Sequence, residues 1–558
     1  MIQPIYATLK TIFADRVFRV PAYQRFYSWR TRQREDLFSD LEKLVQEPED
    51  QHFMGTFVCR RTPETQTVGT AEFRVYDVVD GQQRLTTLIL MLKCIQRVLT
   101  NEDYRKDLDR LLVKKDGHLI LLQTNNANSH IFNSFIQTGQ PPSEDDLTTA
   151  SDRNFRDAIR ACQQFVEDWA AKEKTEVLTR LILHRLGFVL YDVEDPRVVY
   201  TLFEVLNSRG LVVDWLDKTK SVLMGKTYQL SGSQLAADAA IANLQSVWTQ
   251  VYQELAKKDV SGDEVLRVTA TLYYGAGAGK PRAAEDSLDL LRDKCTAATS
   301  AAEIAERLLK ATQKVIRLLE MPRLDPVTEI LQARVLGAAI LLAQGLNEDE
   351  RRKLLNQWER VTFRIFGLHG KDARTMVGPY VTLAHKIVVG DLETQTYNQI
   401  MQALRELGQK YAIDTAVNEG LVRQDCYGRS PGFCRYVLWN YEEHLARQAG
   451  KNATVNAPER DLIWQADASD SVEHIFPRRN AGKTWQGHVG RIGNLVLLPP
   501  KVNAACGAKP FAKKKKIYRQ CMLWMLKPIV DKQHWALKDV EEREDQIVGW
   551  AKTRWCDV

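Results

Sequence analysis

The spacing of apolar residues changes twice along this chain, and the changes divide it into three regions. Residues 1–226 mix short β-like runs with runs of helical period, whereas residues 227–412 show helical period almost throughout, with predicted helices over 236–255, 302–319, 327–342 and 349–366. Residues 413–558 return to a mixed pattern. One hydrophobic core stops growing at about 250–300 residues, and the chain has 558. We therefore expect an α+β multidomain protein that is mostly helical, with a helical connecting domain between two functional domains.

Composition and charge exclude some classes of protein and leave others open. No segment approaches the ~20 apolar residues that cross a membrane, and the first residues lack the basic start and apolar run of a secretory signal. We therefore expect a cytoplasmic protein with no membrane partner. The nine cysteines stand singly without a C-x-x-C pair, which predicts reduced, mostly buried thiols. A net charge of +6 permits binding to nucleic acid without arguing for it.

The first candidate site is a junction between a strand and a helix. Residues 53–58 and 73–79 are predicted strands, and apolar residues at helical spacing follow over 84–99. Between the second strand and the helix stand Asp80 and Gly81, a turn signal. Such a junction presents free backbone N–H groups and the positive end of a helix dipole, which together favour an anion.

The side chains around this junction suit a phosphate group. Gly81 lets a ligand approach the backbone, Arg84 can bind phosphate through two N–H groups, and Thr86 can donate a hydroxyl. Gln82 and Gln83 can read a base, a sugar or an attacking water. The pattern therefore predicts a site for a nucleoside triphosphate or for the DNA backbone. The alternative is that Arg84 pairs with the preceding aspartate and that the two cap the helix.

The second candidate site is a pattern of spacing near the C-terminus. Glu473 and His474 open an E-H-I-F-P run. Asn494 follows twenty residues after the histidine, in G-N-L-V-L-L, and Asn503 stands nine residues further on. Cutting a phosphodiester needs a base that deprotonates water, a metal that neutralises charge and a group that orients the base. Each residue alone has a structural alternative, such as a turn at Asn494 or an N-cap at Asn503, but the joint spacing favours a nuclease.

A basic cluster lies beside this pattern. It consists of Lys513, Lys514, Lys515 and Lys516, with Arg478 and Arg479 upstream. A run of one charge is usually a solvated helix face, but this run flanks the candidate nuclease residues. We therefore predict that the cluster contacts DNA phosphates.

The C-terminal pattern resembles the HNH, or ββα-metal, nuclease motif, in which a β-hairpin and a helix surround one divalent cation. The resemblance implies that His474 is the general base and that Asn494 holds the loop and orients the histidine ring. It also implies that Glu473 and Asn503 bind Mg²⁺ or Mn²⁺. Many HNH enzymes have histidine at the last position, so the asparagine here implies a modest affinity for metal.

Three phrases in the first region carry a second resemblance. They are P-x-Y-Q-R-x-Y-x-W at 21–29, V-D-G-Q-Q-R-L-T-T-L at 79–88 and F-E-x-L-N-x-R-G at 203–210. Together with the HNH pattern they resemble the GmrSD family of type IV, modification-dependent restriction endonucleases, and they are similar to the related SspE and BrxU phage-defence proteins. The resemblance covers both ends of the chain and leaves the helical middle unmatched.

This family resemblance implies a ParB/sulfiredoxin-like core in the first domain (1–226), which binds and hydrolyses ATP or GTP and is implicated in sensing DNA modification. It implies that the last domain (413–558) nicks or cuts modified phage DNA in bacterial defence. Because one HNH site cuts one strand, double-strand cutting suits a homo-oligomer. Carried over by position, the nucleotide-binding residues are Tyr23, Gln24, Arg25, Asp80, Gly81, Gln82, Gln83, Arg84, Thr86, Asn207 and Arg209.

Two other functions stay open at this point. The same HNH site can serve a toxin that cleaves RNA. Alternatively, the chain can sense modified DNA without catalysis and act through a partner. The complete set of Glu473, His474 and the two asparagines argues against the second alternative.

Overall fold

The computed structural model describes residues 4–46, 52–68, 70–113, 121–123, 129–195, 197–200, 202, 214–277, 279–321, 324–390, 396–450 and 457–557. The chain forms two compact units, which are described separately. The first comprises Met1–Ala270 and Arg282–Ile316, and the second comprises Thr271–Pro281 and Arg317–Val558. The structure is 66% helical with one small mixed sheet in the N-terminal region, which confirms a mostly helical α+β fold.

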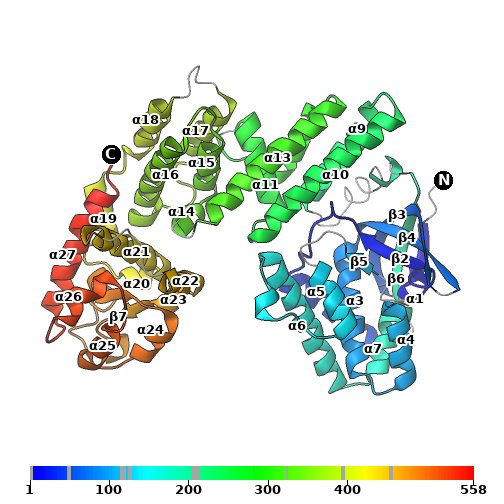
Figure 1. The fold of residues 1–558 in the computed structure, drawn as a ribbon, viewed down its shortest axis with the longest axis horizontal. Coiled ribbons are helices and arrows are strands. Elements are labelled where there is room, and N and C mark those ends of the chain that lie inside the picture. Colours follow the sequence, from blue (N-terminus) through cyan, green and yellow to red (C-terminus); the bar gives the residue numbers. More distant parts are fainter. Residues whose placement is uncertain are drawn as a thin grey trace. The chain divides into compact units, whose positions relative to one another are not determined.

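One six-stranded sheet organises the first unit (Figure 1). Its strands lie in the order β1-β6-β3-β4-β2-β5, with both parallel and antiparallel neighbours. The two predicted strands are confirmed as the antiparallel neighbours β3 and β4, and β3 extends further than predicted. The extension is polar, and it is held by cross-strand pairs such as Arg60 with Asp77 at 2.6 Å. The strands are β1 (Pro4–Thr8), β2 (Arg16–Val20), β3 (His52–Val68), β4 (Ala71–Asp80), β5 (Leu121–Gln123) and β6 (Leu186–Val193).

Helices cover one face of this sheet and bury its apolar side chains. The predicted helix over 84–99 is confirmed as α3, whose leucine and isoleucine side chains are almost completely buried. Phe57 of β3 stacks on Phe188 of β6 with ring centroids 4.6 Å apart, inside the same core. This packing fixes the end of β4 and the start of α3. The helices of this part are α1 (Leu9–Ile12), α2 (Thr31–Gln46), α3 (Gln82–Val98), α4 (Glu102–Leu112), α5 (Ser129–Thr138), α6 (Ala150–Ala170) and α7 (Thr175–Arg180).

The middle of the chain is helical, as predicted, but it is shared between the two units. The contacts divide it at Ile316, so its first helices pack with the sheet unit and the rest with the C-terminal unit. The stretch predicted as one helix over 327–342 is two helices, because Ile330 takes an extended backbone and begins a new one. The helices are α9 (Trp215–Leu230), α10 (Gln234–Lys257), α11 (Gly262–Tyr274), α12 (Ala284–Lys294), α13 (Ala298–Leu319), α14 (Asp325–Thr328), α15 (Leu331–Leu342), α16 (Glu348–Thr362), α17 (Val377–Val389) and α18 (Tyr397–Gly408).

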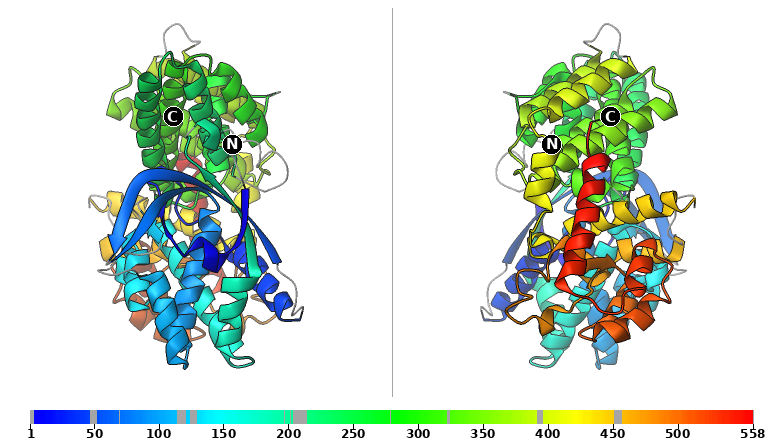
Figure 2. Two further views of the ribbon diagram at one scale, coloured as in Figure 1. Left: turned by 90° about the vertical axis from the view of Figure 1, so that its right-hand side faces the viewer. Right: turned by 90° about the vertical axis from the view of Figure 1, so that its left-hand side faces the viewer.

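A short β-hairpin enclosed by helices forms the end of the second unit. Strands β7 (Val472–His474) and β8 (Leu495–Leu497) pair antiparallel, with His474 opposite Leu495. Figure 2 shows the C-terminal helix α27 (red) lying along the yellow-to-orange segment that carries this hairpin. The helices are α19 (Ile413–Gly420), α20 (Cys426–Arg429), α21 (Pro431–Gln448), α22 (Ala457–Gln465), α23 (Ala468–Ser471), α24 (Pro500–Cys506), α25 (Phe511–Tyr518), α26 (Lys527–Val530) and α27 (Leu537–Arg554).

Two predictions from composition can be compared with this structure. All nine cysteines are free thiols and most are buried, which confirms the prediction from their scattered spacing. Within the described residues, no helix combines the length and the apolar character that a membrane crossing requires.

Candidate functional site

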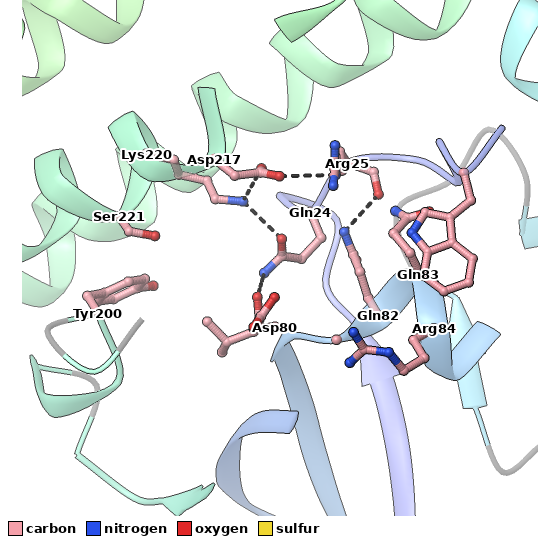
Figure 3. A pocket seen from close by; sticks show the side chains of 13 residues that line it. Gln24, Arg25, Asp80, Gln82, Gln83, Arg84, Tyr200, Asp217, Lys220 and Ser221 are labelled. Atoms are coloured by element: carbon pink, nitrogen blue, oxygen red, sulfur yellow. Dashed lines mark hydrogen bonds and ion pairs between the residues drawn. The ribbon is translucent and has the colours of Figure 1, made fainter. Parts of the chain in front are cut away.

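A cavity in the first unit lies where β4 ends and α3 begins (Figure 3). It brings together most of the residues predicted at the junction with others from α9 and from the segment 21–29. Of the predicted residues, the cavity is lined by Gln24, Arg25, Asp80, Gly81, Gln82, Gln83 and Arg84. Tyr23 and Thr86 are buried and do not line it. Asn207 and Arg209 lie outside the described residues.

Gly81 occupies the predicted turn, and its backbone conformation and packing require a glycine there. Its φ is +89°, in the left-handed region, and it is the N-cap residue of α3. A Cβ at this position would lie 2.3 Å from the ring of Phe57 and 3.1 Å from the carbonyl oxygen of Thr56. Backbone conformation and packing against the core therefore require the glycine, whether or not a ligand approaches.

Arg84 is the cation that this site leaves without a partner. Among the described residues, no hydrogen bond or ion pair of its guanidinium is found, and the group lies over Gly55, where a Cβ would come within 2.7 Å of its NH1. Burial lowers the pKa of Arg84, and the charge of nearby Asp80 partly offsets this effect. The alternative in which the two residues pair and cap the helix is not what the structure contains. Gly55 was not predicted, although an isolated glycine within a strand is a signal for close approach.

The two glutamines after Gly81 do different things. Gln83 donates to the carbonyl oxygen of Phe26 at 3.0 Å and accepts from the backbone N–H of Ser28 at 2.8 Å, so its amide holds the segment 21–29. Gln82 donates to the carbonyl oxygen of Arg25 at 3.3 Å, but its buried Oε1 has no hydrogen-bond partner. A buried acceptor without a partner is costly unless a ligand or water satisfies it.

An ion-pair network closes the opposite side of the cavity, and the sequence did not reveal it. Lys220 of α9 donates to Gln24 Oε1 at 2.9 Å and lies 3.4 Å from Asp217. Asp217 also pairs with Arg25 Nε at 3.0 Å (Figure 3). Burial lowers the pKa of Lys220, and Asp217 raises it in part. A signal was present, because an acid and a lysine three residues apart face the same side of a helix. The other lining residues that were missed are Trp29, Val79, Tyr200 and Ser221.

In the second unit, Asn494 links the strand of His474 to the loop before β8. Its Oδ1 accepts from the backbone N–H of Phe476 at 2.9 Å and from Trp535 Nε1 at 3.0 Å. Its Nδ2 donates to the carbonyl oxygens of Phe476 at 3.1 Å and Val489 at 2.9 Å. The side chain is completely buried, and all four bonds tie loop segments together. It therefore holds the loop, as the resemblance implied, although no contact with the histidine ring is found among these bonds.

His474 ends β7 in a nearly closed environment. Its ring meets that of Tyr427 edge-on, with ring centroids 4.4 Å apart, and its buried Nε2 has no hydrogen-bond partner in the described part of the chain. Burial lowers the pKa of His474 to about 3, with further lowering by the charges of Arg478 and Lys514. At neutral pH the imidazole is therefore neutral, the form that a general base needs, but so low a pKa also makes it a weak base in this closed environment.

Glu473 faces a different set of partners, because successive side chains of a strand alternate. Its Oε1 lies 2.5 Å from Lys514 Nζ and accepts from the hydroxyl of Tyr518 at 3.2 Å. Lys514 is fully buried and also donates to the carbonyl oxygen of His474 at 2.6 Å. The prediction that Lys514 contacts DNA is therefore wrong, because Lys514 and Tyr518 are four residues apart on the buried face of α25. Arg478, Arg479, Lys513 and Lys516 are exposed, while Lys515 is half-buried.

The two predicted metal ligands, Glu473 and Asn503, both have protein partners. The carboxylate of Glu473 is already neutralised by Lys514. Asn503 lies inside α24, whose N-cap residue is Pro499, and it donates from Nδ2 to the carbonyl oxygen of Asp470 at 2.7 Å. Asn503 is therefore not an N-cap either. Across the described residues, no three histidine, cysteine, aspartate or glutamate side chains cluster in a way that would hold a metal.

Comparison with known families identifies both ends of the chain. The family model for the N-terminal domain of the GmrSD restriction endonuclease matches residues 9–224, and the model for the C-terminal domain of GmrSD restriction endonucleases matches residues 413–550. The chain belongs to the GmrSD restriction endonuclease family. The first match contains the cavity at Arg84, and the second contains the hairpin of His474. No curated protein matches the chain. Membership of this GmrSD family supports a nuclease of phage-defence restriction with DNA as its substrate.

Proposed function

We propose that this GmrSD protein is an HNH-type endonuclease that cuts modified phage DNA, depends on a divalent metal and is regulated by a nucleoside triphosphate bound in the N-terminal cavity. The observation that carries the nuclease part is the position of His474 at the end of a strand whose following loop Asn494 holds in place. A neutral imidazole with an unpartnered nitrogen ends a strand that a fully bonded asparagine fixes in place. His474 would take the proton of the attacking water, and its fixed position reduces the entropy lost on reaching the transition state.

The metal proposal rests on the family and on the chemistry, with Mg²⁺ or Mn²⁺ as the expected ion. A divalent cation would neutralise charge on the scissile phosphate. Exposed Arg478, Arg479, Lys513 and Lys516 would bind the DNA backbone, a contribution that salt weakens.

The nucleotide proposal rests on polar groups of the N-terminal cavity that have no hydrogen-bond partner among the described residues. The guanidinium of Arg84 would bind a phosphate, and the first N–H groups of α3 would add the positive end of a helix dipole. The unpartnered Oε1 of Gln82 would accept a hydrogen bond from the base or the sugar of ATP or GTP. Hydrolysis of the nucleotide in this cavity would regulate cutting of DNA. A homo-oligomer would supply two nuclease sites, one for each DNA strand.

The deciding experiment compares His474→Ala with the wild-type chain. We expect Mg²⁺-dependent nicking to fall by roughly 10²–10⁴-fold, the usual contribution of a general base. His534→Ala is the matched control, because His534 is an exposed histidine of the same unit. Wild-type nicking by the His474 variant would show that another group is the base.

The substrate is tested on glucosylated hydroxymethylcytosine phage DNA, phosphorothioated DNA and unmodified plasmid, each with and without ATP or GTP. Cutting confined to one modified DNA supports modification-dependent restriction, whereas equal cutting of all three removes the sensor role. Transfer RNA in a parallel digestion tests the toxin alternative. Inactivity with every divalent metal would favour the non-catalytic sensor.

A further inference from the structure

A second polar cavity lies in the second unit, between α16, α21 and the end of α27. It is lined by Asn356, Glu359 and Arg360 of α16, by Asn440 of α21 and by Arg554 at the end of α27. It contains none of the residues placed in the two candidate sites above. Its lining therefore needs its own explanation.

The carboxylate deepest in this cavity is already satisfied. Glu359 is 3% exposed, accepts from Trp555 Nε1 at 3.0 Å and from Arg554 at 2.8 Å, and also binds the hydroxyl of Tyr436. Its charge is thus matched by Arg554 and its oxygens by three donors. Glu359 can therefore offset the positive charge of a second arginine only in part.

Arg554 is held in place by neighbours that use only part of its guanidinium. Asn440 Oδ1 accepts from Arg554 Nε at 3.2 Å and from its NH2 at 3.0 Å, while Asn440 Nδ2 is fixed on the carbonyl oxygen of Tyr436 at 3.0 Å. The NH1 group of Arg554 makes no hydrogen bond to the described residues. A rigid, partly used guanidinium is a ready donor for an anion.

Arg360 is the uncompensated charge of the cavity. Its Nε is buried without a partner, and no hydrogen bond or ion pair of its guanidinium occurs within the described parts of the chain. Burial lowers the pKa of Arg360 and the positive charge of Arg554 lowers it further, while the charges of Glu359 and Asp557 offset this lowering in part. At the rim, Glu443 and Arg447 pair with each other at 3.1 Å, so Glu443 does not neutralise Arg360.

We propose that this cavity binds a phosphate group, held between the guanidinium groups of Arg360 and Arg554. Two planar arginine forks match the oxygens of a phosphate, and an anion would neutralise the excess charge that the protein leaves there. The phosphate can belong to a small molecule or to the backbone of DNA. The two sources share this chemistry, and the experiments below separate them.

Phosphate binding at this site would affect the nuclease hairpin through α27. Arg543, on the same helix as Arg554, donates to the carbonyl oxygen of Gly493 at 2.8 Å, and its neighbour Glu544 pairs with Arg491 at 2.6 Å. These residues hold the segment that ends in Asn494. The cavity is thereby suited to regulate cutting without touching the reacting atoms.

The first experiment measures binding of inorganic phosphate to the full-length chain by calorimetry. It is done in an Arg84→Gln background, so that the N-terminal cavity does not contribute. Arg360→Gln should weaken binding by at least about 10-fold, because a charge-assisted pair of hydrogen bonds is lost. Lys353→Gln is the matched control, since it removes one exposed charge of α16 whose partner is Asp349. It should bind phosphate like the background protein.

The second experiment measures the affinity of the protein for a DNA duplex without terminal phosphates at increasing salt concentration. If the site takes a backbone phosphate, Arg360→Gln should reduce the salt slope by about one. Loss of free phosphate binding with an unchanged salt slope assigns the site to a small molecule, and a smaller salt slope assigns it to DNA. No change in either measurement overturns the proposal.

Folding of the variants is checked by thermal unfolding. If Arg360→Gln does not fold, Arg360→Lys replaces it, because lysine keeps the charge and loses the two-pronged contact. The lysine variant should bind phosphate or DNA more weakly than the parent. Binding equal to that of the parent would exclude the site.

Discussion

The two candidate sites of this protein use their polar residues in opposite ways. In the N-terminal cavity, Arg84 and the Oε1 of Gln82 have no hydrogen-bond partner among the described residues, so they face the cavity unused. In the C-terminal hairpin, Glu473 and Lys514 neutralise each other and Asn494 uses all four of its hydrogen bonds within the protein. A motif residue can therefore act through a polar group that is left free for a ligand, or by holding in place a neighbour that has such a group.

The variant with the largest expected effect tests whether Glu473 serves only to stabilise the fold through its ion pair with Lys514. Lys514→Met leaves a buried carboxylate without its partner, which should reduce the free energy of unfolding by about 3–5 kcal/mol in a urea titration. Adding Glu473→Gln should restore much of the loss. If Glu473 also binds the metal, the stable double variant will lose Mg²⁺-dependent nicking. If it nicks normally, the pair is structural alone.

The second prediction concerns Glu442, a buried carboxyl of the C-terminal unit for which no ion pair is found among the described residues. Glu442 accepts from the backbone N–H groups of Trp524 and Met525, and burial raises its pKa to about 7 from the ordinary 4.5. The folded state holds this proton more tightly, so the stability that it contributes is complete below pH 4.5 and is lost as the pH rises through about 7. The loss amounts to about 3 kcal/mol.

The measurement is the free energy of unfolding across that pH window for the wild type and Glu442→Gln. The variant cannot ionise, so its stability should fall less steeply. Parallel curves for the two proteins would mean that Glu442 titrates normally.

The third prediction tests whether the guanidinium of Arg84 binds the phosphate of a nucleotide. Arg84→Gln should weaken ATP or GTP binding by roughly 10–100-fold, the value of a charge-assisted contact to phosphate. Metal-dependent nicking in the absence of nucleotide should persist, because His474 belongs to the other unit. Arg105→Gln, which removes an exposed arginine paired with Glu102, is the control. Unchanged nucleotide affinity in the Arg84 variant would remove the cavity as the nucleotide site.

The smallest expected effect separates packing from ligand approach at Gly81. Gly81→Ala should destabilise the protein by about 1–2 kcal/mol, because its φ is +89° and the Cβ would meet Phe57. Gly225→Ala, in the middle of α9 with nothing near its Cβ, should be neutral or slightly stabilising. A stable Gly81 variant that loses nucleotide binding would instead favour ligand approach as the reason for the glycine.

Much of the architecture could be predicted because it follows from local patterns. Alternation and β-branched residues identified β3 and β4, and helical spacing identified α3, α10 and α13. The division of the helical middle between two units could not be predicted, because periodicity shows that a helix has an apolar face and does not show which core that face joins.

The same limit applies to the sites. Spacing along the chain was enough to bring Asp80, Gly81 and Arg84 to one junction and to select His474 and Asn494, since these choices depend on short-range geometry. Which charges pair depended on contacts between distant segments. Lys220 reaches Gln24 and Lys514 reaches Glu473, whereas Arg360 has no hydrogen-bond partner among the described residues although a glutamate precedes it in the sequence. The residue types and their order specify which chemistry is available, but burial and long-range packing determine which of those groups stay free to use it.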